Sequence, residues 1–157
     1  MKKVFKYKQK LVLEQNQFYH FKLHKKVKGF SGYSYLVMID PFGNKHLVPA
    51  EYYLTYKLKV RNTYLCKVDK INCLGRIFIE PPHPYYKENE TYKFRFVKTL
   101  KEKHKLGSVQ LYYQFLGENK YEALFKENNS LSEHLKTGIH SFRIKKISKG
   151  KVFIDYC

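Results

Sequence analysis

Acidic residues, cysteines and long apolar runs are all scarce in this chain of 157 residues. Only 13 Asp and Glu accompany 31 Lys and Arg, which leaves a formal net charge of +18. A surface tuned only for solubility carries a much smaller charge. The imbalance therefore predicts attraction to a polyanion, either a nucleic acid or an acidic membrane.

The absence of long apolar runs and of cysteine pairs limits the cellular compartments in which we expect the protein. No run of about 18 apolar residues occurs, so the sequence predicts no membrane-spanning segment. Met1–Lys6 is charged and lacks the apolar stretch of a signal peptide. Cys66, Cys73 and Cys157 are odd in number and have no CxxC spacing, which favours a cytoplasmic protein with reduced thiols. Membrane-surface binding is not expected, because no basic amphipathic helix is visible.

Patterns for catalysis and metal binding are also missing. No arrangement of histidines with HxxxH or HxxE spacing is accompanied by a pair of cysteines that could complete a metal site. Asp40, Asp69, Glu80 and Asp155 are dispersed, and no glycine-rich phosphate loop occurs. We therefore expect a non-enzymatic protein with no cofactor and no metal.

What the chain does have is an internal repeat. Stretches of the first half return in the second with a spacing that drifts by a few residues, as two copies of one fold with small loop changes would give. We expect domains at 18–81 and 87–157, a proline-rich linker at 82–86 and a basic extension at 1–17. The paired stretches are Tyr19–Leu23 with Tyr92–Phe96, Gly43–Leu47 with Gly117–Tyr121, and Lys70–Glu80 with Lys146–Asp155.

The two segments outside the repeat have different characters. The stretch Pro81-Pro82-His83-Pro84 predicts a stiff, extended linker that holds the domains at a fairly fixed spacing, with His83 in solvent. The extension 1–17 is compatible with a remnant closing strand, an added strand, an arm that orders on a partner, or a frayed terminus.

Apolar residues alternate with a period of two throughout, which is typical of half-buried strands. Each half yields strands with a short helix before the fourth, at Pro49–Leu54 and at Asn129–Leu135 with Ser130 as N-cap. This plan predicts an all-β fold of two tandem five-stranded OB-like barrels, with another small barrel or a meander as the alternative. The expected strands are Phe18–Lys25, Tyr33–Asp40, Lys45–Val48, Thr63–Ile71, Gly75–Glu80, Thr91–Leu100, Ser108–Leu116, Lys120–Phe125, Gly138–Ile147 and Lys151–Tyr156.

Several stretches follow the pattern of one family, namely Tyr35–Pro49, Val60–Ile71 with Gly75–Ile79, and Lys136–Ile144 with Gly150–Ile154. They resemble the S-one-type OB domain, the RNA-binding repeat of a large protein of the small ribosomal subunit. The chain departs from that family at Asn62, where a glycine is usual, and in an opening strand built on Tyr19-His20-Phe21. The resemblance implies RNA binding, and it also allows a place in a ribosome-associated or RNA-polymerase-associated complex.

The loop between the first and second strands is basic in both halves. OB barrels bind single strands on strands two and three and on adjacent loops, where lysines suit phosphates and a stacked aromatic is worth roughly 1–3 kcal/mol per base. The alternative is a solvated loop whose aromatics fold onto the barrel end. The loop candidates are Lys25, Lys26, Lys28, Phe30 and Tyr33 in the first half, and Lys98, Lys101, Lys103 and Lys105 in the second.

Further candidates lie along strands two and three. If Leu36 and Met38 point inward, Tyr35 points outward, and alternation alone is equally compatible with the reverse. Tyr19, Phe21, Phe94 and Phe96 are expected in the core. The face candidates are Tyr35, Phe42, Lys45 and His46 in the first half, and Tyr112, Lys120 and Tyr121 in the second.

These features favour a cytoplasmic protein that binds RNA or single-stranded DNA. Two linked units would share one strand, because linkage raises the effective concentration. The alternative is a structural or accessory subunit of a ribonucleoprotein or transcription complex whose OB domains mainly contact protein.

Overall fold

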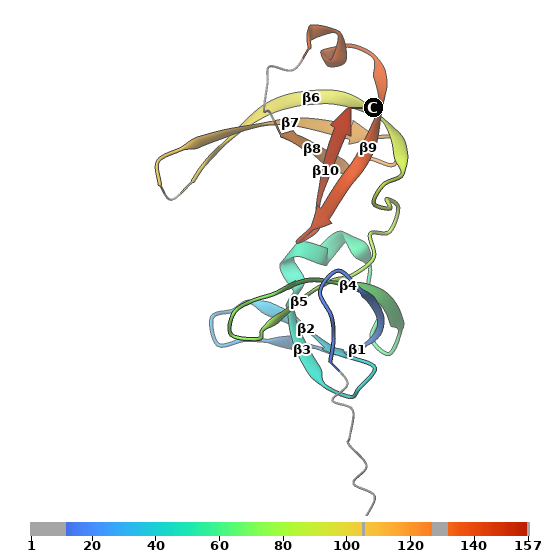
Figure 1. Ribbon diagram of the computed structural model, residues 1–157, viewed down its shortest axis with the longest axis vertical. Coiled ribbons are helices and arrows are strands. Elements are labelled where there is room, and N and C mark those ends of the chain that lie inside the picture. The colour runs from blue at the N-terminus through green and yellow to red at the C-terminus, as the bar shows by residue number, and fades with distance from the viewer. Residues whose placement is uncertain (1–11, 105, 127–131, 157) are drawn as a thin grey trace, which may run out of the picture. The chain divides into compact units, whose positions relative to one another are not determined.

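The computed structural model describes residues 12–104, 106–126 and 132–156 (Figure 1). The chain divides into two compact units, Met1–Ala50 with Leu58–Pro81 and Glu51–Lys57 with Pro82–Cys157. Each unit holds one five-stranded sheet, and helices are few and short. The predicted all-β fold with two copies of one plan is confirmed.

The first sheet has the strand order β3-β2-β1-β4-β5, and every neighbouring pair is antiparallel. No ladder joins β3 to β5 in the part of the chain that the structure describes, so this sheet stays open along that seam. The 3-10 helix η1, at Ala50–Tyr56, follows β3 directly. The strands are β1 (Phe18–Lys28), β2 (Ser34–Ile39), β3 (Lys45–Pro49), β4 (Thr63–Ile71) and β5 (Ile77–Glu80).

The second sheet has the same order, β10-β8-β7-β6-β9, and closes into a barrel. The closing pair is parallel, with Phe153 of β10 opposite Leu124 of β8. A barrel whose first strand lies between the second and fourth, and whose third and fifth strands close it, has the OB arrangement. The strands are β6 (Thr91–Lys103), β7 (Val109–Gly117), β8 (Glu122–Lys126), β9 (Ile139–Ser148) and β10 (Lys151–Tyr156).

The helix of the second unit is shorter than expected. The 3-10 helix η2 covers Glu133–Lys136, and its N-cap residue is Ser132, whose side chain makes no capping hydrogen bond. The predicted N-cap, Ser130, lies outside the described residues.

The strand registers show which positions of the two units correspond. Leu23 lies opposite Met38 in the first unit, and Phe96 lies opposite Phe115 in the second. In both units the first strand has a bulge directly after this residue. A bulge adds one unpaired residue and shifts the faces of everything beyond it. Because both copies carry it, the outward and inward positions remain matched.

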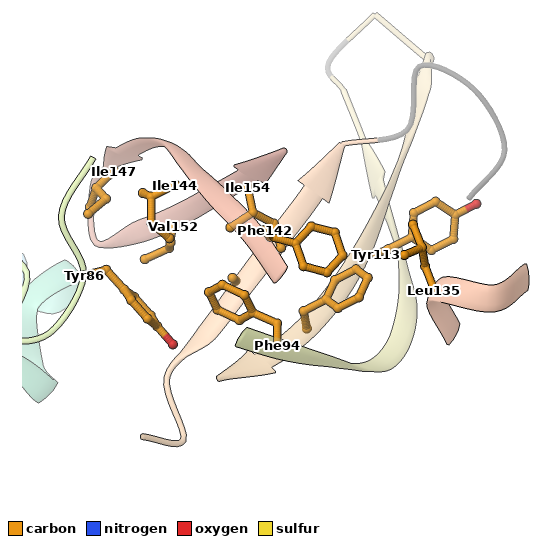
Figure 2. Close-up of a cluster of buried hydrophobic side chains, with 11 residues drawn as sticks. Tyr86, Phe94, Tyr113, Leu135, Phe142, Ile144, Ile147, Val152 and Ile154 are labelled. Atoms are coloured by element: carbon orange, nitrogen blue, oxygen red, sulfur yellow. The ribbon is translucent and has the colours of Figure 1, made fainter. Parts of the chain in front are cut away.

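Aromatic rings fill the second barrel (Figure 2). Phe94, Phe115 and Phe142 are buried, and the centroids of Phe115 and Phe142 lie 4.6 Å apart. The ladders place Met38 and Cys66 of the first unit at the positions of Phe115 and Phe142. Burial raises the pKa of the Cys66 thiol to about 12, so this cysteine acts as a small apolar core residue.

A short segment before the first strand of each unit also repeats. We name residues 13–17 and 86–90 the straps. Leu13 and Tyr86, at the same place in the two straps, are 4% and 2% exposed. Burial at the head of each strap anchors it to its own core, and Figure 2 shows the Tyr86 ring directed into the second core.

Backbone hydrogen bonds fix the two straps in the same way. Asn16 N–H donates to the Val68 carbonyl and Asn89 N–H donates to the Ile144 carbonyl, both at 2.8 Å. Both asparagines have positive φ, 65° and 68°, a conformation in which asparagine is enriched. The straps are therefore part of each folded unit.

This arrangement corrects the expectation of a solvated linker. His83 is half-buried, and its Nδ1 accepts the N–H groups of Tyr85 and Tyr86 at 3.1 and 3.0 Å. Its ring stacks on Tyr86 and meets Tyr121 edge-on at 4.9 Å. Burial lowers the pKa of His83 to about 4. On the N-terminal side, residues 12–17 form no strand, and 1–11 lie outside the described residues.

Candidate functional site

The orientation of the second strand, left open by alternation, follows from burial. Met38 and its ladder partner Leu23 are both 0% exposed and face the core of the first unit, so by alternation Leu36 faces the core and Tyr35 faces outward. Residues opposite each other in a ladder share a face. We name the side of each sheet that carries this tyrosine the outer face. In the first unit it carries Lys25, Val27, Tyr35, Val37, Ile39, Lys45 and Leu47.

A groove lies on the outer face of the first unit, between β3 and the turn that joins β4 to β5. Its volume is about 440 Å³, within the range of small-ligand pockets. The Arg76 guanidinium lies 5.1 Å from the centroid of Phe78, so a cation and a ring flank the groove on the β5 side. The lining residues are Tyr35, Lys45, His46, Leu47, Gly75, Arg76 and Ile77.

The second unit repeats this face. Tyr112 lies at the position of Tyr35, because each is opposite an apolar residue of the first strand three places beyond the bulge. The rings of Tyr112 and Phe153 are 6.4 Å apart, and Lys126 is opposite Tyr112 on β8. Burial, together with Glu102, raises the pKa of Tyr112, so its hydroxyl stays protonated.

Cations accompany these rings in both copies. Lys25 and Lys98 occupy one matched outer position, and Arg76 and Lys151 occupy another. Lys151 also reaches Glu102, with Nζ to Oε1 at 3.7 Å, a weak and partly exposed pair. A repeated surface of rings and cations suits a polymer with flat, uncharged rings and regularly spaced anions.

Four of the predicted lysines lie on the side opposite to the outer face. Alternation places Lys26 and Lys28 of β1, and Lys101 and Lys103 of β6, on the opposite side of their strands. They lie on paired strands and not on the flexible loops that we predicted, because β1 and β6 run further than expected. The β6–β7 hairpin projects beyond its own barrel (Figure 1). Lys105 lies outside the described residues.

Apolar side chains occupy the tips of the hairpins. Phe30, in the turn that Gly29 and Gly32 close, is 116% exposed, and Tyr33 beside it is exposed as well. At the tip of the β6–β7 hairpin, Leu106 is 97% exposed. The predicted aromatics are therefore free of the barrel end and available for contact.

His46 and Phe42 have structural contacts. The Nε2 of His46 lies 2.9 Å from the carboxylate of Asp40, and its ring meets Phe21 edge-on. Asp40 also accepts the N–H groups of Phe42 and Asn44 at 2.8 and 2.9 Å. Burial raises the pKa of Asp40, but these hydrogen bonds outweigh it and the pKa lies below its usual value. Both predicted residues thus brace the β2–β3 turn.

The repeat alignment placed Lys120 and Tyr121 incorrectly. Lys120 N–H donates to Gly117 as Gly43 N–H donates to Asp40, so Lys120 corresponds to Gly43 in the turn. Both have positive φ, 65° and 87°. Tyr121 then precedes β8 and packs against His83, away from the outer face. Sequence similarity aligned Gly43 with Gly117, which differs from the structural correspondence by three residues. Nothing in the sequence alone shows this difference.

Five outer-face residues were missed, namely Arg76, Phe78, Lys126, Lys151 and Phe153. For four of them a signal was present, since Arg76 pairs with Lys151 and Phe78 with Phe153 in the repeated closing hairpins. A cation and a phenylalanine kept at the same two places in both copies are not needed for the core, which uses the alternate positions Ile79 and Ile154.

Within the described ranges, no three His, Cys, Asp or Glu side chains come close enough together to hold a metal ion. No helix there is both long and apolar enough to cross a membrane.

Comparison with known proteins adds no assignment. No family model, no curated protein and no solved structure gives a significant match to this chain. The class that the fold defines is an all-β protein of two five-stranded OB-type units.

Proposed function

We propose that the protein binds single-stranded nucleic acid, RNA or DNA, on the two outer faces, without catalysing a reaction. The observation that supports this most directly is the repetition of rings and cations at matched positions: Tyr35 with Tyr112, Phe78 with Phe153, Lys25 with Lys98, and Arg76 with Lys151. These side chains lie outside the buried cores, and their recurrence supports a ligand shared by the two faces.

The physical chemistry of the faces fits this ligand. The four rings of the outer faces are half-buried, and the surface that they leave accessible can stack on bases of any sequence, at roughly 1–3 kcal/mol per base. The cations that border the two faces neutralise phosphates and release counterions. These cations are Lys25, Lys45, Arg76, Lys98, Lys126 and Lys151.

Titration of a labelled oligonucleotide at increasing salt tests the proposal. Neutralising about six phosphates gives a log–log slope of affinity against salt near −4, at roughly 0.7 per phosphate. The double variant Tyr35→Ala/Tyr112→Ala should weaken binding at least tenfold, whereas Tyr35→Phe/Tyr112→Phe, which keeps both rings, should bind as the wild type does. A slope near zero, or equal affinity of all three proteins, would contradict the proposal.

A second function is favoured by the hairpin tips. Phe30, Leu74 and Leu106 are almost fully exposed, and apolar side chains at such places suit contact with protein. Under this hypothesis the chain is an accessory subunit of a ribonucleoprotein or transcription complex. A protein partner that stays bound after nuclease digestion, and is lost in Phe30→Ser, would support it. Loss of the partner on digestion alone would contradict it.

A further inference from the structure

The two outer faces differ at one central position. Val37 in the first unit lies opposite Lys25 and Leu47. Its counterpart in the second unit is Gln114, which lies opposite Lys98 and Leu124. The neighbours are conserved in kind, so the exchange of valine for an amide is the main chemical difference between the two centres.

Gln114 is a buried polar side chain with an unused acceptor. It is 7% exposed, and its Oε1 has no hydrogen-bond partner among the residues that the structure describes. Leaving a buried acceptor unpaired is costly, so native proteins retain such a group mainly where it has a use. The side chain lies on the outer face, because Tyr113 and Phe115 on either side of it point into the core.

Resting on the proposed function, we propose that Gln114 makes the second unit selective for bases that carry an exocyclic amino group. A base stacked on Tyr112 presents its edge to the position two residues along the same strand, where the amide oxygen accepts the amino hydrogen. The first unit, with Val37 at this place, stacks any base.

The choice of base follows from donors and acceptors. Cytosine presents an amino donor at position 4, and uracil presents a carbonyl acceptor at the same place. A uracil edge therefore leaves Oε1 unpaired. The ladder neighbours of Gln114 on this face are the exposed Lys98 and the half-buried Leu124, and neither belongs to the buried core. We therefore infer that a base approaches the amide from the outer face.

Competition between two pyrimidine oligomers tests this on the full chain. Oligocytidine and oligouridine of about 12 nucleotides lie within the ~4–16 that one OB fold covers. We expect the wild type to bind oligocytidine about tenfold more tightly, in line with one discriminating hydrogen bond. In Gln114→Val, which copies the first unit, the ratio should fall to about one while oligouridine affinity is unchanged.

Two controls separate the possible results. Gln110→Val alters a glutamine on the same face further along the hairpin and should keep the preference. The melting temperature of Gln114→Val should equal or exceed that of the wild type, because the variant removes an unpaired buried atom. A wild type without preference, or a preference that survives Gln114→Val, overturns the inference and leaves the proposed function standing. No binding of either oligomer overturns both.

Discussion

The cores of the two units use the same ladder positions, but different side chains occupy these positions. The second core has Phe115 and Phe142 where the first has Met38 and Cys66. The second sheet closes through a parallel pair, and the first stays open on that seam. Position in the ladder, and not side-chain size, is thus what the two copies share. Aromatic rings bury more area per residue and suit a closed interior.

The straps offer the sharpest comparison of stability. Tyr86→Ala should lower the free energy of unfolding of the second unit by about 3–5 kcal/mol, and Leu13→Ala should lower that of the first by about 2–5 kcal/mol. Urea unfolding of the full chain, with probes in each unit, measures both. Tyr86→Phe keeps the ring and is the matched control. If Tyr86→Ala costs less than about 1 kcal/mol, the strap is not part of the core.

The two sides of the β1 and β6 strands can be compared by ligand affinity. Lys25→Gln/Lys98→Gln removes outer-face charges, and Lys28→Gln/Lys101→Gln removes matched charges from the opposite side. The first pair should reduce the salt slope by about 1.4, since each phosphate contributes roughly 0.7. The second pair should change it much less. Equal losses would show that the ligand does not follow the outer faces.

His83 should make the stability of the second unit depend on pH. Burial lowers its pKa from 6.5 to about 4, so the folded state favours the neutral ring. Its contribution to stability is complete above pH 6.5 and declines as the pH falls toward 4. His83→Asn keeps an acceptor without this titration. The stability difference between wild type and variant should therefore shrink across that window, as measured by denaturant titration at each pH. A constant difference would argue against the buried, neutral histidine.

The β2–β3 and β7–β8 turns allow a small reciprocal test. Gly43 and Lys120 share a turn position with positive φ, which costs a non-glycine residue about 1–2 kcal/mol. Lys120→Gly should therefore raise the thermal stability of the second unit, and Gly43→Lys should lower that of the first by a similar amount. Opposite signs are the expected result in calorimetry, and a loss of stability in both variants would remove the equivalence.

Period-two alternation was enough to predict the strands, because each strand has one buried face. It did not predict which side chains share a face near the bulges. One extra residue after Leu23 and Phe96 inverts the alternation, so Lys25 and Lys98 lie on the outer face and the lysines that follow at alternate positions do not. The correspondence between residues of the β2–β3 and β7–β8 turns could not be predicted either, because sequence similarity aligns Gly117 with Gly43. Gly117 is instead required because Tyr86 occupies the place of a Cβ there.

The positions of the candidate side chains could be predicted only in part, for the same reason. Tyr35 and Tyr112 lie on the outer face, which is one of the two orientations that alternation allowed, whereas His46 pairs with the buried carboxylate of Asp40. Whether a candidate side chain is accessible or held by another residue depends on partners that are distant in the sequence. The unpaired amide of Gln114 is similarly invisible until the strands are assembled.

The repeated straps also define how far each unit extends. Leu13 and Tyr86 stand at equal distances before their first strands, and the bonds that follow them match. A unit cut at its first strand would lack this buried residue and would have a gap in its core. The segment that forms a complete core therefore includes the strap. A second unit that lacks residues 86–90 should accordingly have an incomplete core.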